Sequence, residues 1–250
     1  MECFLKLKDV GLNQTREIKK YMNNEEMAKN SAHILLQELV IGFWRDVQFI
    51  QRLGNNRFKG YATSIARMAF DKCIRLIYLT KQKSPKDQDR LAELELMRTS
   101  RKFYFIELNN GEEKNAKKWK DFYNLVKRNT DEEVDASDKK IKSFLDTKSM
   151  LQKSQFSDWE KVYINYGFLC EDIHGGLFNL MTKREINDTT REYNMALMFI
   201  IRFMREVVVL TDFHFQTNSS KSKLQECENI LQKAGHPNLT KDDTVKNCFK

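Results

Sequence analysis

The residues best suited to chemistry lie in one aromatic-rich stretch, SDWEKVYINYGFLCEDIHGGLFNL, which runs from Ser157 to Leu180. His174 follows Glu171 by three residues, a spacing that places a carboxylate and an imidazole on the same side of a helix. Imidazole changes its charge near neutral pH without a large pKa shift. His174 is therefore our first candidate for a general acid or base.

A second set of polar residues recurs at helical spacing in the stretch IARMAFDKCIRLIYLT. Arg67, Asp71, Arg75 and Tyr78 follow one another at steps of three or four residues, so they form one stripe along a helix. In one interpretation the stripe is a solvated face with a weak Arg67–Asp71 ion pair. In the other it faces inward and lines a polar pocket. The sequence leaves both interpretations open.

A metal site is not favoured by the spacing of the histidines. Glu171 and His174 have the spacing of carboxylate-bridged di-iron bundles, but such a site needs that motif twice. The positions three residues before the other histidines hold Asn30, Thr211 and Lys233, none of which is a carboxylate. The chain also has no CxxC or HxxxH motif for zinc. We predict no metal and no cofactor.

The elements that must position these residues are predicted to be helices. Only two prolines and nine glycines occur in 250 residues, and 41% of the residues are hydrophobic. So few breakers, together with long helical periodicities, predict an all-α protein. We expect a single-domain bundle of about six to eight helices over residues 1–215, followed by a short helix and a polar tail over residues 216–250.

The boundaries of these helices follow from caps, breakers and apolar spacing. The first eleven residues give no clear pattern. We expect the 157–180 helix to lie at the centre, with the other helices as a shell around it, and the largely apolar 189–213 helix to be central as well. The first expected helix covers residues 13–53, with Asn23 and Asn24 as the place where it could be interrupted. The other expected helices cover residues 58–81, 84–108, 112–128, 138–152, 157–180, 189–213 and, more weakly, 221–233.

Charge and cysteine content suggest what kind of partner and compartment to expect. The 43 lysines and arginines exceed the 35 acidic residues, which gives a net charge of +8. A surplus of this size favours acidic or phosphate-bearing partners. The five cysteines are odd in number and scattered, which is typical of a reducing compartment. With no signal peptide or apolar span in view, we expect a cytoplasmic protein without a membrane partner.

The segment from about residue 61 to 213 resembles a bacterial and archaeal helical domain family of unknown function. That family has an early helix with an arginine four residues before an acid, and a later aromatic-rich helix that ends in a histidine followed by small residues. Here the two motifs read Arg67-Met-Ala-Phe-Asp71 and YINYGFLCEDIHGG, which contains His174. The family is distantly similar to the HEPN domains.

The resemblance implies an RNA- or nucleotide-directed role. Many HEPN proteins are metal-independent ribonucleases of defence and toxin-like systems, and the HEPN analogy also implies a homodimer. On this basis His174, Arg67 and Asp71 are the candidate catalytic residues. Arg75, Glu171 and Tyr78 are the candidate ligand-binding residues, with RNA or a nucleotide as the partner.

Two other hypotheses assign no reaction to these residues. In the first, the chain is a non-catalytic helical module whose polar residues orient helices or bind nucleic acid, an anionic ligand or a protein. In the second, it is an interaction protein that works through its lysine-rich surface. The catalytic hypothesis requires Arg67 and His174 to share one cleft, with room for a single phosphate between them.

Overall fold

The fold is entirely helical over the part of the chain that the structure describes. The computed structural model describes residues 2–21, 30–54, 59–128, 144–154, 158–173 and 189–217, with short helical turns at 225–227 and 229–230 and residue 233. The predicted all-α class is confirmed. The helices are α1 (Glu2–Tyr21), α2 (Ser31–Leu53), the 3-10 turn η2 (Lys59–Tyr61), α3 (Ala62–Thr80), α4 (Pro85–Asn109), α5 (Glu113–Arg128), α6 (Thr147–Lys153), α7 (Trp159–Ile173) and α9 (Thr189–Phe215).

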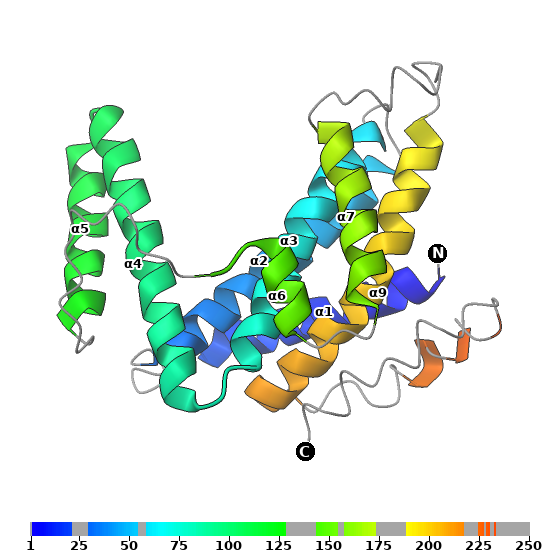
Figure 1. Ribbon diagram of the computed structural model, residues 1–250, viewed down its shortest axis with the longest axis horizontal. Coiled ribbons are helices and arrows are strands. Elements are labelled where there is room, and N and C mark those ends of the chain that lie inside the picture. The colour runs from blue at the N-terminus through cyan, green and yellow to red at the C-terminus, as the bar shows by residue number, and fades with distance from the viewer. Residues whose placement is uncertain are drawn as a thin grey trace.

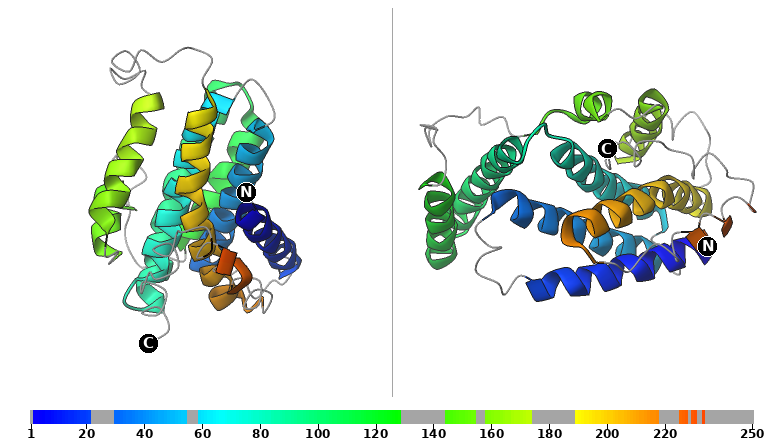
Figure 2. Two further views of the ribbon diagram at one scale, coloured as in Figure 1. Left: turned by 90° about the vertical axis from the view of Figure 1, so that its right-hand side faces the viewer. Right: turned by 90° about the horizontal axis from the view of Figure 1, so that it is seen from below.

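Three helices form the centre of the bundle, and the others pack on them. α3 contacts both α2 and α9, and α1 covers α2 and α9 on one side. On the other side, α6 and α7 both pack on α3 (Figure 1). The antiparallel pair α4 and α5 projects from the bundle as an arm, which is attached where α4 contacts α2 and α3 (Figures 1 and 2).

Several helix ends lie where the local sequence predicts them. Ser84 caps α4 by accepting a hydrogen bond from the Asp87 backbone N–H at 3.2 Å, and Pro85 is the first helical residue. Asn30 caps α2 in the same way, through the backbone N–H of His33 at 2.9 Å, a helix start that the expected 13–53 helix did not include. Gly111, in the tight turn between α4 and α5, has a φ of +77°, a conformation that favours glycine.

The core does not lie around α7, although the sequence suggested that α7 would be central. Its largest fully buried side chains come from α1, α2, α3, α4 and α9, and Trp44, Phe70 and Phe203 are among them. α7 buries Val162, Tyr166 and Leu169 but leaves Tyr163 and Ile164 exposed. The prediction was wrong because an apolar arc shows only that one face is covered; it does not show that the helix is surrounded. The prediction that α9 is central is confirmed.

Two expected helix starts also need correction. The first eleven residues are helical, since α1 begins at Glu2 and buries Phe4, Leu7 and Val10 at steps of three residues. The helix expected from residue 138 begins at Thr147 in the described residues, with Asp146 as its N-cap. Residues 22–29, 129–143 and 174–188 lie outside the described part of the chain.

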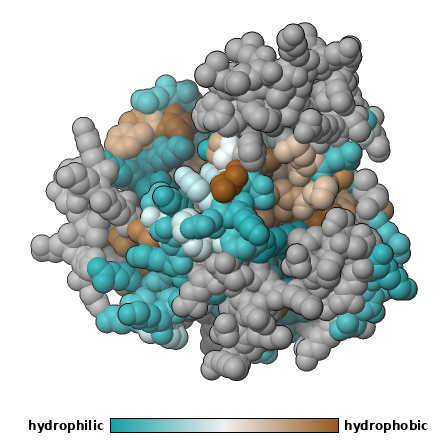
Figure 3. Space-filling model, turned by 45° about the vertical axis from the view of Figure 1, so that its right-hand side comes forward, coloured by the Kyte–Doolittle hydropathy of each residue, from teal (hydrophilic) through white to brown (hydrophobic). Residues whose placement is uncertain are grey.

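The surface carries hydrophobic areas separated by hydrophilic ones (Figure 3). A hollow of about 320 Å³ between α7 and α9 is mostly apolar and includes Met198 and Phe199. Among the described residues that line it, only Arg202 is charged, and it makes a two-point ion pair with Asp158 at 2.7 and 2.8 Å. None of the described helices is long and apolar enough to cross a membrane.

Two partly buried histidines should make the stability depend on pH. His214 lies at the end of α9, and its pKa is lowered mainly by burial and further by the charge of the nearby His33. Burial also lowers the pKa of His33, whose ring lies 4.7 Å from that of Phe215. Unfolding restores the higher pKa, so the unfolded chain binds more protons below about pH 6.5. We expect the free energy of unfolding to fall as the pH drops below that value.

Denaturant unfolding of the wild type and of His214→Leu, followed between about pH 8 and pH 5, checks this expectation. The variant should lose less stability over this interval than the wild type. Parallel losses in the two proteins would show that other groups cause the pH dependence.

Candidate functional site

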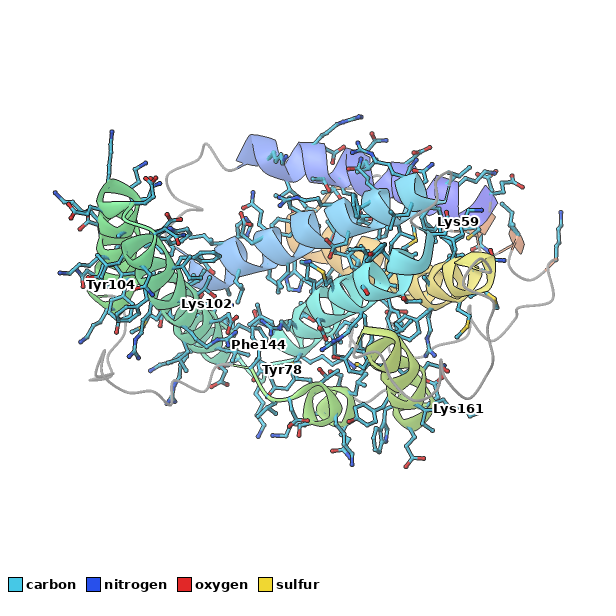
Figure 4. The ribbon with its side chains drawn as sticks, turned by 90° about the horizontal axis from the view of Figure 1, so that it is seen from above. Lys59, Tyr78, Lys102, Tyr104, Phe144 and Lys161 are labelled. Carbon is cyan, nitrogen blue, oxygen red and sulfur yellow. The ribbon has the colours of Figure 1, made fainter. Side chains whose placement is uncertain are left out.

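The polar stripe of α3 faces its neighbours and is not a solvated face. Arg67, Asp71, Arg75 and Tyr78 are all partly buried. They lie along the side of α3 that meets α7, the segment around Phe144, and α4. In Figure 4, Tyr78 and Phe144 lie beside each other on this side of the bundle.

Arg67 is held by a tyrosine of α7. Its Nε donates a hydrogen bond to the hydroxyl oxygen of Tyr166 at 3.3 Å, and its Cζ lies 5.7 Å from the centroid of that ring. The expected Arg67–Asp71 ion pair is not formed: within the described ranges, no carboxylate lies within 4 Å of the guanidinium. The hydrogen bond to Tyr166 raises the pKa of Arg67, so the group keeps its charge.

The same tyrosine joins Asp71 to the cluster. Burial raises the pKa of the Asp71 carboxyl, and hydrogen bonding with Tyr166 and the charge of Arg67 oppose that rise. Burial also raises the pKa of Tyr166, against hydrogen bonds with Arg67 and with Thr147 at the start of α6. Three helices therefore meet at one phenol hydroxyl. We call Arg67, Asp71, Tyr166 and Thr147 the tyrosine cluster.

Arg75 belongs to a second cluster, centred on a buried carboxylate of α4. Glu95 accepts a hydrogen bond from Arg75 Nη1 at 3.0 Å and two from Arg98, at 2.9 and 2.7 Å. The Arg75 Cζ also lies 5.3 Å from the centroid of the Phe144 ring, which packs edge-on against Tyr78 at 6.2 Å. Arg75 is thus paired with a carboxylate within the protein, whereas Arg67 has no ion pair with a described carboxylate and interacts with Asp71 only at longer range.

The structure tests only one half of the predicted pairing of Arg67 with His174. The packing of α3 against α7 is confirmed. His174 lies outside the described residues, and of Glu171 only the helical backbone is described. The two residues remain predictions from the sequence.

Sequence analysis missed the two residues that organise the stripe, Tyr166 and Glu95. Tyr166 lies in the apolar arc of α7, where its ring packs 5.2 Å from that of Phe70. The signal for it was its hydroxyl, because a buried phenol usually has a hydrogen-bond partner. Glu95 gave a similar signal, since an acid among the apolar residues of α4 is rarely buried without a cation.

The fold and this site define a helical bundle with a partly buried, cationic polar cluster at a helix–helix contact. Within the described ranges, no group of three or more histidine, cysteine or acidic side chains is arranged to hold a metal ion. Comparisons of the chain with protein-family models, with curated proteins and with solved structures find no match. The functional argument therefore depends on the geometry of the chain itself.

Proposed function

We propose that this protein is an RNA- or nucleotide-directed protein of HEPN-like type that binds a phosphate at the tyrosine cluster. One observation carries the proposal: Arg67 donates through Nε to the Tyr166 hydroxyl, while no described carboxylate forms an ion pair with its terminal nitrogens. A guanidinium oriented in this way can donate from its terminal nitrogens to two phosphate oxygens at once. Partial burial strengthens such bonds, because it reduces competition from water.

The reaction that best fits this group is metal-independent RNA cleavage. A base removes the proton of the ribose 2′-hydroxyl, and the 2′-oxygen attacks phosphorus. The bond from phosphorus to the 5′-oxygen then breaks, and an acid gives that oxygen a proton, which leaves a 2′,3′-cyclic phosphate. Arg67 would stabilise the charge that develops on the phosphate, with Asp71 beside it in the cluster. His174 would transfer one of the two protons.

Cleavage of a generic RNA in the presence of EDTA tests the reaction. We expect the wild type to cleave, and His174→Ala and Arg67→Ala to lose that activity. Arg16→Ala is the matched control, because Arg16 is exposed on α1 and bonded to Asn13. If the wild type is as inactive as the variants, the protein is not a ribonuclease of this kind.

A non-catalytic binding module is the second candidate, favoured by the Glu95 cluster. Two arginines from different helices converge on this buried acid, which is how polar residues fix helix positions. Binding of inorganic phosphate and of mononucleotides, followed by calorimetry, separates the candidates. Binding that Arg67→Ala weakens, without any cleavage of RNA, would favour the module.

The resemblance to HEPN domains also leads us to propose a homodimer and a role in a defence or toxin-like system. Sedimentation of the purified protein tests the first of these. A monomer at micromolar concentration would argue against the HEPN-like assembly.

A further inference from the structure

The outer part of the arm is a basic, aromatic surface that the tyrosine cluster does not use. Ser100 is the last buried residue of α4. The outer part of α4 lies apart from the bundle, and α5 packs on α4 (Figures 1 and 2). The stacking of Phe103 on Trp119, with ring centroids 4.9 Å apart, joins the two helices. Residues 99–128 contain eight lysines and arginines and four acidic residues, so they hold a net charge of +4, half of the charge of the chain.

Several large apolar side chains of the arm face solvent. Phe105 is 48% exposed and Leu125 is 57% exposed, and Phe103, Ile106 and Leu108 are also exposed. So many exposed apolar side chains are unusual on the surface of a protein that has no partner there. This surface is also positively charged. Two copies of the arm meeting face to face would bring like charges together, which disfavours self-association as the reason for these residues.

One side of the arm contains a small pocket of about 160 Å³ between its two helices. Three aromatic rings, two cations and one amide line it: Arg101, Tyr104, Phe105, Lys120, Tyr123 and Asn124. The Arg101 Cζ lies 5.9 Å from the centroid of the Phe105 ring, so a cation lies beside a ring that is 48% exposed. Figure 4 shows Tyr104 on the arm, apart from Tyr78 and Phe144 on the bundle.

We propose that this side of the arm binds single-stranded nucleic acid. An unpaired base would stack against the rings of the pocket, and its flanking phosphates would contact Lys120 and Lys117, which is one turn earlier on α5. Aromatic rings beside cations are the combination that single strands use, because unpaired bases expose their faces and phosphates supply the charge. A duplex hides its base faces, so it would meet the cations but not the rings. Binding of an acidic protein is an alternative that the test below distinguishes.

Binding at the arm extends the proposed function to a second surface. It rests on that function only for the choice of a nucleic acid as the ligand. The pocket would hold the strand, while the tyrosine cluster would act on it elsewhere. Oligothymidylate separates the two, because it lacks the 2′-hydroxyl that the cleavage reaction requires. Binding to the arm can therefore be measured whether or not the protein cleaves RNA.

The test compares variants on opposite sides of the arm, by fluorescence anisotropy with labelled oligothymidylate and oligouridylate at several salt concentrations. Phe105→Ala should weaken binding about tenfold, the usual effect of removing one stacking ring. Lys120→Gln should weaken it and reduce the slope of log affinity against log salt by about 0.7, as expected for one lost phosphate contact. Lys118→Gln is the charge-matched control, because Lys118 lies about 160° around α5 from Lys120 and is also exposed.

Three results would overturn the proposal. The wild type could fail to bind either oligonucleotide, Lys118→Gln could weaken binding as much as Lys120→Gln, or an acidic protein could bind equally well at the same sites. Circular dichroism establishes that each variant is folded. If the arm variants lose binding while Arg67→Ala binds oligothymidylate normally, the arm proposal stands even if no cleavage is ever seen.

Discussion

Gly11→Ala is expected to destabilise the protein by about 2 kcal/mol or more, although alanine is the better helix former. Gly11 lies in α1, against the ring of Trp44 in α2. A Cβ at this position would lie 2.0 to 2.4 Å from three atoms of that ring. Trp44 is fully buried in the core, so its ring can move away only by displacing other core side chains. The two helices would have to separate, which would reduce the packing of the whole α1–α2 contact.

Gly167→Ala is the matched control, and its expected effect has the opposite sign. Gly167 is also a helical glycine, but a Cβ built on it meets no described atom within 4 Å. Its replacement should therefore show only the helix propensity, a gain of about 0.5–1 kcal/mol. Denaturant unfolding of both variants measures the difference. A stabilised Gly11→Ala protein would show that α1 does not lie against Trp44 as described.

Tyr166→Phe is expected to cost about 1–2 kcal/mol, the typical penalty for leaving buried polar partners unsatisfied. The change removes one oxygen and keeps the ring, so the packing on Phe70 is preserved. Arg67 loses its hydrogen bond at 3.3 Å, and Asp71 loses the bond that opposes the burial-induced rise of its pKa. The Asp71 carboxyl should then hold its proton to a higher pH.

Tyr163→Phe provides the control, one turn away on the same helix. Tyr163 is exposed, and its ring stacks beside that of Tyr166, so the loss of its hydroxyl should change stability by less than 0.5 kcal/mol or so. A double-mutant cycle of Tyr166→Phe with Arg67→Ala isolates the coupling between the two side chains. Additive effects would mean that Tyr166 does not orient Arg67, and the proposed phosphate site would lose its main support.

The local parts of the fold could be predicted from the sequence, because they depend on neighbouring residues. Ser84, Pro85 and Asp87 mark the start of α4, and the structure confirms that cap. The start of α1 was missed because Gly11, a breaker, interrupts the pattern just before residue 13, where the helix was expected to begin. Gln14, a polar residue at a buried position, shows what local patterns miss. Gln14 is buried because its Nε2 donates to the Val208 carbonyl oxygen of α9 at 3.0 Å. No local pattern can show a partner 194 residues away.

The candidate site shows the same division. The spacing of Arg67, Asp71 and Arg75 placed them on one side of α3, and they do share that side. The spacing also suggested that Arg67 pairs with Asp71, since residues four apart on a helix are neighbours. Instead, Arg67 donates a hydrogen bond to Tyr166 of α7, and Arg75 donates one to Glu95 of α4.

The sequence by itself determined that the chain is helical, where most of its helices lie and which side of α3 is polar, because propensity, caps and side-chain spacing act within a few residues. Only the tertiary structure decided that α7 lies at the edge, that Tyr166 holds Arg67 and that α4 and α5 leave the bundle as a basic arm. These outcomes depend on which helix faces are buried together, and that choice minimises exposed apolar surface over the whole chain.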